Sequence, residues 1–166
     1  FPRLVVEIGA DAEATVAEVQ TSVPGAGLVA TVTEIAVGDA LPPFELNVTS
    51  TVIVAGAIAS RDFMPAHHDP VFAKAQGAPD VFMNILTTNG YVARYVTDWA
   101  GPEAMLTSIK IRLGAPAVPG KPLRFSGHIA GKRDVGNECV LEVAIRAAND
   151  LGDHATGTVT LTLPLD

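Results

Sequence analysis

Two ionisable side chains, Asp62 and His67, lie five residues apart with Pro65 between them. A carboxylate and an imidazole can share one water molecule: the imidazole, with an ordinary pKa of about 6.5, gives or takes a proton, while the carboxylate orients the water or takes its proton. The same spacing fits a structural interpretation, in which Asp62 caps a turn and His67 packs beside it. Spacing alone favours the structural interpretation, so the choice depends on the surrounding residues.

The elements that must position this pair follow it in the chain. Apolar side chains recur every three or four residues from Phe82 to Trp99, which predicts a long helix that Gly101-Pro102 ends. Side chains then alternate with a period of two in four runs, which predicts strands over Met105–Leu113, Leu123–Ala130, Cys139–Ala147 and Thr156–Leu163. A long helix followed by four strands predicts an α+β domain in which an antiparallel sheet covers one helix.

The patterns before residue 52 are weaker. They predict a strand over Leu4–Ile8, a helix over Asp11–Ser22 that Pro24-Gly25 ends, and strands over Leu28–Ile35 and Phe44–Thr51. Residues 1 to 35 are interpreted as an N-terminal extension of uncertain role: an extra pair of elements, a remnant of a fused module, or an acidic docking surface.

Composition narrows the function classes. The chain has 166 residues, 48% of them hydrophobic, and a net charge of −7, which is typical of one acidic globular domain. Because residues 1–60 have a net charge of −6 and residues 61–166 a net charge of −1, neither part has a basic excess, and nucleic acid is not an expected partner. The longest apolar run, residues 52–59, is much shorter than the ~20 residues that span a bilayer, so a cytoplasmic location is expected.

The residues around Asp62 and His67 change the balance between the two interpretations. The segment Ser60–Ala73 resembles the hydratase motif of the MaoC-like enoyl-CoA hydratases, in which Ser-Gly-Asp, Asn-Pro, His and Asp-Pro follow in this order. The resemblance implies a hot-dog fold, in which an antiparallel sheet wraps a long helix, over residues 36 to 166. It also implies that Asp62 and His67 are the catalytic pair.

Further blocks resemble a subgroup of that family, the small catalytic subunits of heteromeric hydratases that act on steroid side-chain enoyl-CoA thioesters. These blocks are Arg61–Phe63, His67–Asp69, Ala75–Gly77, Asn84–Thr87, Arg94–Pro102, Phe125–Gly127 and Leu151–His154. The resemblance implies the addition of water across the 2,3 double bond of a trans-2-enoyl-CoA, with no cofactor because CoA is part of the substrate. It implies a second MaoC-like subunit, in a heterodimer or heterotetramer, and otherwise a homodimer.

Two departures from the family pattern concern the site. Many relatives use the backbone N–H of a glycine at the start of the long helix to bind the thioester oxyanion, and Asn84 stands at the matching position here. Its backbone N–H is the expected oxyanion donor, because a helix N-terminus favours negative charge. Met64 stands where most relatives have Asn, which removes a polar group that could orient the pair.

Three cations are candidate ligands for the CoA phosphates: Arg94, Lys121 and Arg124. Each also has a structural interpretation, since Arg94 suits a helix C-terminus and the other two suit a solvated turn. His128 and His154 have no ligand-type spacing to a third residue, so no metal site is expected.

Three other functions stay open. The chain could be a homodimeric hydratase for short or medium acyl chains, a hot-dog acyl-CoA thioesterase, or a non-catalytic hot-dog subunit. The prolines and acids around His67 disfavour the thioesterase, and the presence of both Asp62 and His67 disfavours the non-catalytic subunit.

Overall fold

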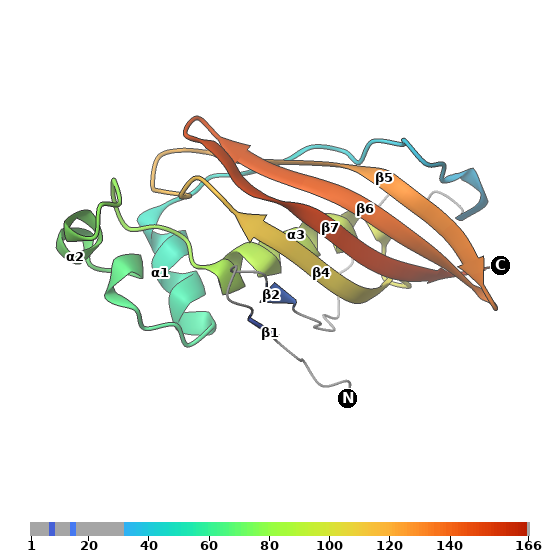
Figure 1. Cartoon of the computed structure of the whole chain (residues 1–166), viewed down its shortest axis with the longest axis horizontal. Helices are drawn as coiled ribbons and strands as arrows, with labels where there is room; N and C mark the ends of the chain where they lie inside the picture. Colours follow the sequence, from blue (N-terminus) through green and yellow to red (C-terminus); the bar gives the residue numbers. More distant parts are fainter. Residues whose placement is uncertain (1–6, 9–13, 16–31, 166) are drawn as a thin grey trace.

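The computed structural model describes residues 7–8, 14–15 and 32–165 (Figure 1). The long elements are one helix, α3 (Ile85–Ala100), and four strands, β4 (Met105–Leu113), β5 (Leu123–Val135), β6 (Glu138–Asn149) and β7 (Gly152–Pro164). The shorter elements are β1 (Glu7–Ile8), β2 (Ala14–Thr15), η1 (Val32–Glu34), β3 (Phe44–Leu46), α1 (Ser50–Ala59), η2 (Pro65–His67) and α2 (Pro70–Ala75).

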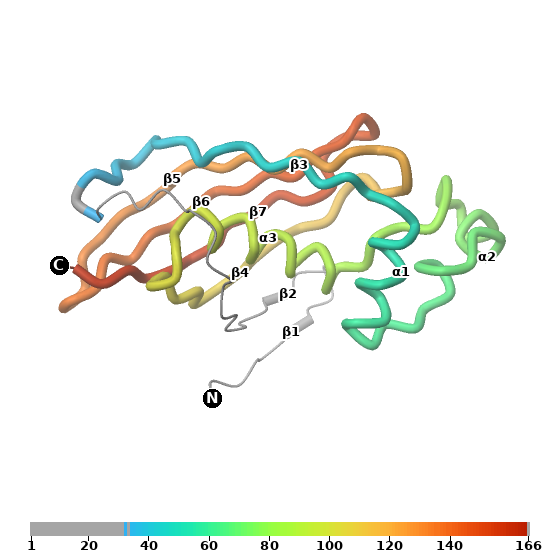
Figure 2. The backbone as a smooth tube through the Cα atoms, turned by 180° about the vertical axis from the view of Figure 1, so that it is seen from behind, coloured from blue at the N-terminus to red at the C-terminus, as the bar shows by residue number. Residues whose placement is uncertain are grey.

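The strands form one antiparallel sheet in the order β1-β2-β4-β7-β6-β5-β3. The sheet curves around α3, which lies against one of its faces, while α1 and α2 lie together beyond one end of the sheet (Figures 1 and 2). This is the hot-dog arrangement, so the predicted α+β fold is confirmed. No helix in the part of the chain that the structure describes is long and apolar enough to cross a membrane.

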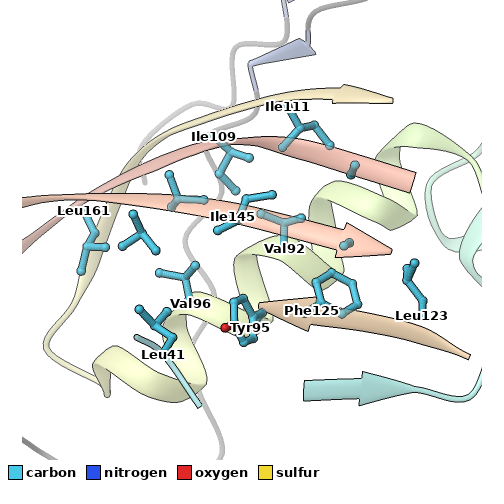
Figure 3. Close-up of a cluster of buried hydrophobic side chains, with 14 of the residues drawn as sticks. Leu41, Val92, Tyr95, Val96, Ile109, Ile111, Leu123, Phe125, Ile145 and Leu161 are labelled. Atoms are coloured by element: carbon cyan, nitrogen blue, oxygen red, sulfur yellow. The ribbon is translucent and has the colours of Figure 1, made fainter. Parts of the chain in front are cut away.

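Side chains from α3 and the sheet form the core (Figure 3). Val92, Tyr95 and Val96 on α3 are buried, and so are their sheet neighbours Phe125 and Ile145. Burial of an aliphatic or aromatic side chain of this size stabilises the fold by roughly 1.5–3 kcal/mol. The helix is thereby held rigidly against the sheet, and this fixes the position of its N-terminal end.

The predicted helix and strands after residue 80 are confirmed, with shifted ends. The helix begins at Ile85 rather than Phe82, because the Asn84 side chain accepts a hydrogen bond from the Thr87 N–H at 2.9 Å and caps the first turn. It ends where predicted, with Gly101 at a φ of 85°. Strand β4 has the predicted bounds, whereas β5, β6 and β7 run further than predicted because the turns that join β5 to β6 and β6 to β7 are short.

The predictions before residue 52 were partly wrong. The run Phe44–Thr51 is a strand only to Leu46, because Thr49 caps α1 by accepting a hydrogen bond from the Val52 N–H at 3.1 Å. Within the run Leu28–Ile35, Val32–Glu34 form a 3-10 turn instead of a strand, and residues 28–31 lie outside the described residues.

Two short strands replace the elements predicted nearest the N-terminus. Glu7–Ile8 agree with the predicted first strand, of which residues 4–6 lie outside the described residues. The helix over Asp11–Ser22 is wrong at Ala14–Thr15, which pair with β4 as strand β2, and the remainder lies outside the described residues. The open edge of β4 offers hydrogen bonds to any segment beside it, and this outweighs local helix propensity. The domain boundary at residue 35 stays a prediction.

Candidate active site

The C-terminal end of α1 fixes the backbone of Asp62. Ser60 is the C-cap residue of α1, and Arg61 after it adopts a left-handed conformation with a φ of 57°. The Asp62 N–H donates to the Ala57 carbonyl at 2.8 Å. The Arg61 N–H donates to the Ile58 carbonyl at 3.0 Å, which completes a Schellman motif. Asp62 therefore follows the helix at a defined position instead of lying in a free loop.

His67 lies in the next turn and is buried, with 6% of its surface exposed. Its Nδ1 atom lies 2.7 Å from the Phe82 carbonyl oxygen, and the edge of the ring packs on the Phe82 ring with centroids 5.1 Å apart. Because a carbonyl only accepts, Nδ1 carries the proton in this contact. The other ring nitrogen, Nε2, is directed at Asp62 and is 3.3 Å from Oδ2.

Both oxygens of Asp62 have partners. Oδ1 accepts from the Met64 N–H at 3.2 Å, and Oδ2 accepts from the Asn84 side-chain nitrogen at 2.9 Å. The Asp62 side chain is still 28% exposed. The predicted pair is thus brought together, and its two polar ends, Oδ2 and His67 Nε2, are close enough to bind one water molecule jointly. The turn-cap interpretation of Asp62 is also realised, because the Met64 N–H is one of its donors.

Asn84 connects three segments. Its side-chain nitrogen donates to Ser60 Oγ and to Asp62 Oδ2, both at 2.9 Å, while its side-chain oxygen caps α3. Its backbone N–H has no hydrogen-bond partner among the described residues, as an oxyanion donor requires. The sequence predicted a role only for that backbone group. A polar residue directly before a helical pattern was the available signal for the cap, but nothing in the sequence indicated the contact with Asp62.

Close packing of α1 on α3 makes these contacts possible. A Cβ atom added at Gly56 would lie 2.3 Å from Thr87 Oγ1, so only glycine permits this approach. Gly56 is also the acceptor for Ser60 Oγ, at 2.7 Å. The small residue at position 56 therefore allows the C-terminal end of α1, with Ser60 and Asp62, to reach the first turn of α3.

A second buried histidine supports the same turn of α3. His154 on β7 is 2% exposed; its Nδ1 atom lies 2.8 Å from the Ala115 carbonyl oxygen and its Nε2 atom 2.9 Å from Thr88 Oγ1. Burial lowers the pKa of His154 below its usual 6.5, so the ring is neutral near pH 7. In that state Nδ1–H donates to the Ala115 carbonyl, and Nε2 can only accept from the Thr88 hydroxyl, whose single proton is shared with the Asn84 carbonyl oxygen at 3.0 Å. From the sequence, His154 was excluded as a metal ligand and belonged to one of the resembling blocks, but no structural role was predicted for it.

The neighbouring polar residues have structural roles. Asp69 caps α2, as its position before Pro70 suggests, by accepting from the Val71 and Phe72 N–H groups at 2.8 and 3.1 Å. His68 is exposed and ends the 3-10 turn.

The three candidate cations do not form one cluster. Arg94 pairs with Asp98 at 3.2 Å and lies over the Phe44 ring, 5.4 Å from its centroid. Arg124 pairs with Glu45 at 3.0 Å and Asp150 at 3.5 Å. Because Phe44 and Glu45 are consecutive residues of β3, their side chains point to opposite faces of the sheet. Arg94, which contacts Phe44, and Arg124, which contacts Glu45, therefore lie on opposite sides of the sheet.

Lys121 lies in the connection between β4 and β5 and is half-buried. A contact between any of the three cations and CoA phosphates stays a prediction. Among the described residues there is no group of three histidine, cysteine or acidic side chains that could hold a metal ion.

Large apolar side chains are exposed on the segments that carry the pair. Phe63 is 68% exposed, and Ile58, Met64 and Val71 are also exposed. Large apolar side chains exposed on neighbouring segments are candidates for contact with a ligand or another protein.

Comparison with known proteins agrees with this geometry. The chain is 46% identical over 127 residues to the 3-oxo-4,17-pregnadiene-20-carboxyl-CoA hydratase beta subunit of Mycobacterium tuberculosis, covering 76% of this chain and 95% of that protein. The crystal structure of the ChsH1-ChsH2 complex from M. tuberculosis contains a chain that superposes with a TM-score of 0.73 at 45% identity, covering 77% of this chain and 98% of that one.

More distant structures share the fold. The unliganded R-hydratase PhaJ1 from Pseudomonas aeruginosa superposes with a TM-score of 0.71 at 18% identity, covering 81% of this chain and 85% of that one. The model of the family described as "MaoC like domain" matches residues 34–150, which include all the residues of the candidate site except His154. The chain therefore belongs to the MaoC-like domain family.

Proposed function

We propose that this chain is the catalytic subunit of an enoyl-CoA hydratase that adds water across the 2,3 double bond of a steroid side-chain trans-2-enoyl-CoA. The observation that carries the proposal is the 3.3 Å contact between His67 Nε2 and Asp62 Oδ2. The substrate class is supported by the 46% identity to a subunit of a hydratase whose name specifies a steroid carboxyl-CoA.

The pair acts on one water molecule. One member removes a proton from the water as its oxygen bonds to C3, and the other helps to deliver a proton to C2, so the product is the 3-hydroxyacyl-CoA. Positioned proton transfer of this kind typically accelerates a reaction by about 10²- to 10⁴-fold. The Nδ1 proton of His67 is held by the Phe82 carbonyl, so Nε2 is the ring atom that exchanges protons with water.

The thioester oxygen gains negative charge while water adds, and the proposed donor to it is the backbone N–H of Asn84. This N–H precedes a 16-residue helix, whose N-terminus favours negative charge. The loss of one such donor typically costs about 3 kcal/mol of transition-state stabilisation. The reaction needs no cofactor, since the thioester itself withdraws the electrons.

A second MaoC-like subunit is the proposed partner. The similar chain in the solved M. tuberculosis structure belongs to a complex of two named proteins. The exposed Phe63, Met64 and Val71 give a partner or a bulky apolar substrate a surface to cover beside the pair. A homodimer remains the alternative if the isolated chain proves active.

The test follows the absorbance of the conjugated enoyl thioester. Wild type and Asp62→Asn are each assayed on a steroid side-chain enoyl-CoA and on a short straight-chain enoyl-CoA, with and without a MaoC-like partner subunit. We expect partner-dependent loss of absorbance for the steroid thioester, and no loss for the variant.

Two results would change the proposal. Turnover of the short thioester alone, by the isolated chain, would indicate a homodimeric hydratase for short chains. Turnover of neither substrate, or equal turnover by wild type and Asp62→Asn, would contradict the catalytic assignment.

A further inference from the structure

We infer that the side chain of Asn84 is a positioning residue that holds the Asp62 carboxylate against His67. The kinetic part of this inference rests on the proposed function, whereas its structural part does not. The role is separate from that of the Asn84 backbone N–H, which points to the substrate in the proposed mechanism.

The hydrogen-bonding partners fix the orientation of the Asn84 amide. The Thr87 N–H is a donor, so the atom 2.9 Å from it is the amide oxygen. The amide nitrogen then donates to Asp62 Oδ2 and to Ser60 Oγ, whose own proton is donated to the Gly56 carbonyl at 2.7 Å. The amide nitrogen therefore uses both of its protons, and a reversed amide would satisfy neither the Thr87 N–H nor Asp62 Oδ2.

Helix capping alone does not explain an asparagine here. Serine, threonine and aspartate cap helices about as well, because a cap needs only one acceptor oxygen. The additional donor is what Asp62 requires: Oδ2 accepts from the Asn84 amide and lies 3.3 Å from His67 Nε2, and Oδ1 accepts from the Met64 N–H. Asn84 is 3% exposed, so water cannot easily replace this donor.

In the described loop after Asp62, the next two residues, Phe63 and Met64, supply no equivalent side-chain donor. Met64 has an apolar, half-exposed side chain and contributes only its backbone N–H, and Phe63 is apolar. Among the described residues, the side-chain groups that contact the Asp62 oxygens are those of Asn84 and His67. Since Asn84 is anchored at the start of α3, it ties the orientation of Asp62 to the rigid helix rather than to the loop.

Two substitutions separate this role from capping. Asn84→Ser keeps a capping oxygen and the backbone N–H but cannot reach Asp62 with a donor. Asn84→Asp keeps the cap and the size of the side chain, removes the donor, and adds a carboxylate beside Asp62. We expect both to lower kcat roughly 10- to 100-fold, the usual effect of losing a hydrogen bond to a charged group, with little change in KM.

The pH profile distinguishes the two variants. A second carboxylate beside Asp62 favours its protonated form, so Asn84→Asp is expected to move the acid limb of the kcat profile to higher pH by about one unit. Asn149→Asp is the matched control, because Asn149 is also buried, donates to the Pro116 carbonyl at 3.0 Å and accepts from the Leu151 N–H at 2.8 Å. It is expected to lower stability without moving the acid limb.

Crystal structures of wild type and Asn84→Ser give a readout that does not need activity. We expect the Asp62 carboxylate of the variant to turn away from His67 while α3 keeps its first turn. An unchanged carboxylate together with unchanged kcat and acid limb would overturn the inference. If wild type instead shows no Asp62-dependent hydration, the proposed function fails, and the orientation of Asp62 in the two structures still decides the role of Asn84.

Discussion

His67 Nε2 lies 3.3 Å from Asp62 Oδ2 although the two residues belong to separate turns, one held by α1 and the other by the Phe82 carbonyl. Neither side chain is placed by the other alone. Asp62 is fixed by the cap of α1 and by Asn84, and His67 by its Nδ1 contact, so the pair is assembled before any substrate binds. Such preorganisation avoids a rearrangement cost during the reaction.

The tight contact between α1 and α3 should be sensitive to one methyl group. Gly56→Ala would place Cβ 2.3 Å from Thr87 Oγ1, so we expect overpacking to lower the free energy of unfolding, by about 1–3 kcal/mol. Activity should fall as well, because α1 carries Asp62.

Gly90→Ala is the matched control for Gly56→Ala. Gly90 also lies in a helix, but no atom approaches within 4 Å of an added Cβ. It should raise the free energy of unfolding by roughly 1 kcal/mol through helix propensity. Urea denaturation of the isolated chain measures both, and equal effects of the two substitutions would contradict the packing argument.

The left-handed backbone conformation of Arg61 should lower the free energy of unfolding. A residue with a Cβ atom is destabilised by roughly 1–2 kcal/mol in this conformation. Glycine avoids this strain, but the greater flexibility of glycine in the unfolded chain offsets part of the gain. We expect Arg61→Gly to raise the free energy of unfolding by up to about 1 kcal/mol. Arg61→Ala removes the same side chain but keeps the strain, so it should not stabilise. If thermal unfolding ranks the alanine variant at or above the glycine variant, the strain is not the cause.

Tyr95 carries a buried hydroxyl with no hydrogen-bond partner in the part of the chain described. Burial raises its pKa to about 12, so the group stays neutral over the whole working range. Tyr95→Phe should therefore raise the free energy of unfolding by about 1 kcal/mol, the approximate cost of burying an unpaired polar group. Tyr91→Phe, at a half-buried position on the same helix, should change little. A clear loss of stability in Tyr95→Phe would show that the hydroxyl has a partner.

His154 should make stability depend on pH. Its folded-state pKa lies below the usual 6.5, so the unfolded chain binds more protons as the pH falls below about 6.5. The stabilisation is complete above that pH and decreases towards the folded-state pKa, by at most about 1.4 kcal/mol per pH unit. His154→Gln removes this dependence, so the stability difference between wild type and variant should shrink from pH 7 to pH 5. A constant difference would mean that His154 does not titrate as inferred.

Sequence periodicity predicted the long helix and the four long strands, whose conformation is determined by the burial of one face. The stripe from Phe82 to Trp99 and the alternation in the last four strands were sufficient for α3 and β4 to β7, because burial on one face imposes those periods. The motif around Asp62 and His67 placed the candidate pair. Strand β2 could not be predicted in this way, because the edge of β4 determines its conformation.

Contacts between distant residues were not accessible from the sequence. The Asn84 amide reaches Asp62, 22 positions earlier in the chain, only because Gly56 lets α1 meet α3. Thr88 and His154, 66 positions apart, meet because β7 passes the first turn of the helix. Both contacts depend on the packing of the whole fold, so the spacing of residues in the sequence does not predict them.

The cooperation of Asp62 and His67 is the central claim, and a double-mutant cycle on kcat/KM tests it most directly. Asp62→Asn, His67→Gln and the double variant are assayed on the steroid enoyl-CoA thioester with the partner subunit present. We predict that each single substitution lowers kcat/KM by at least about 100-fold and that the double variant is no worse than either, because residues that act as one unit lose their contribution together. Losses that multiply in the double variant, or a single substitution without effect, would contradict the account.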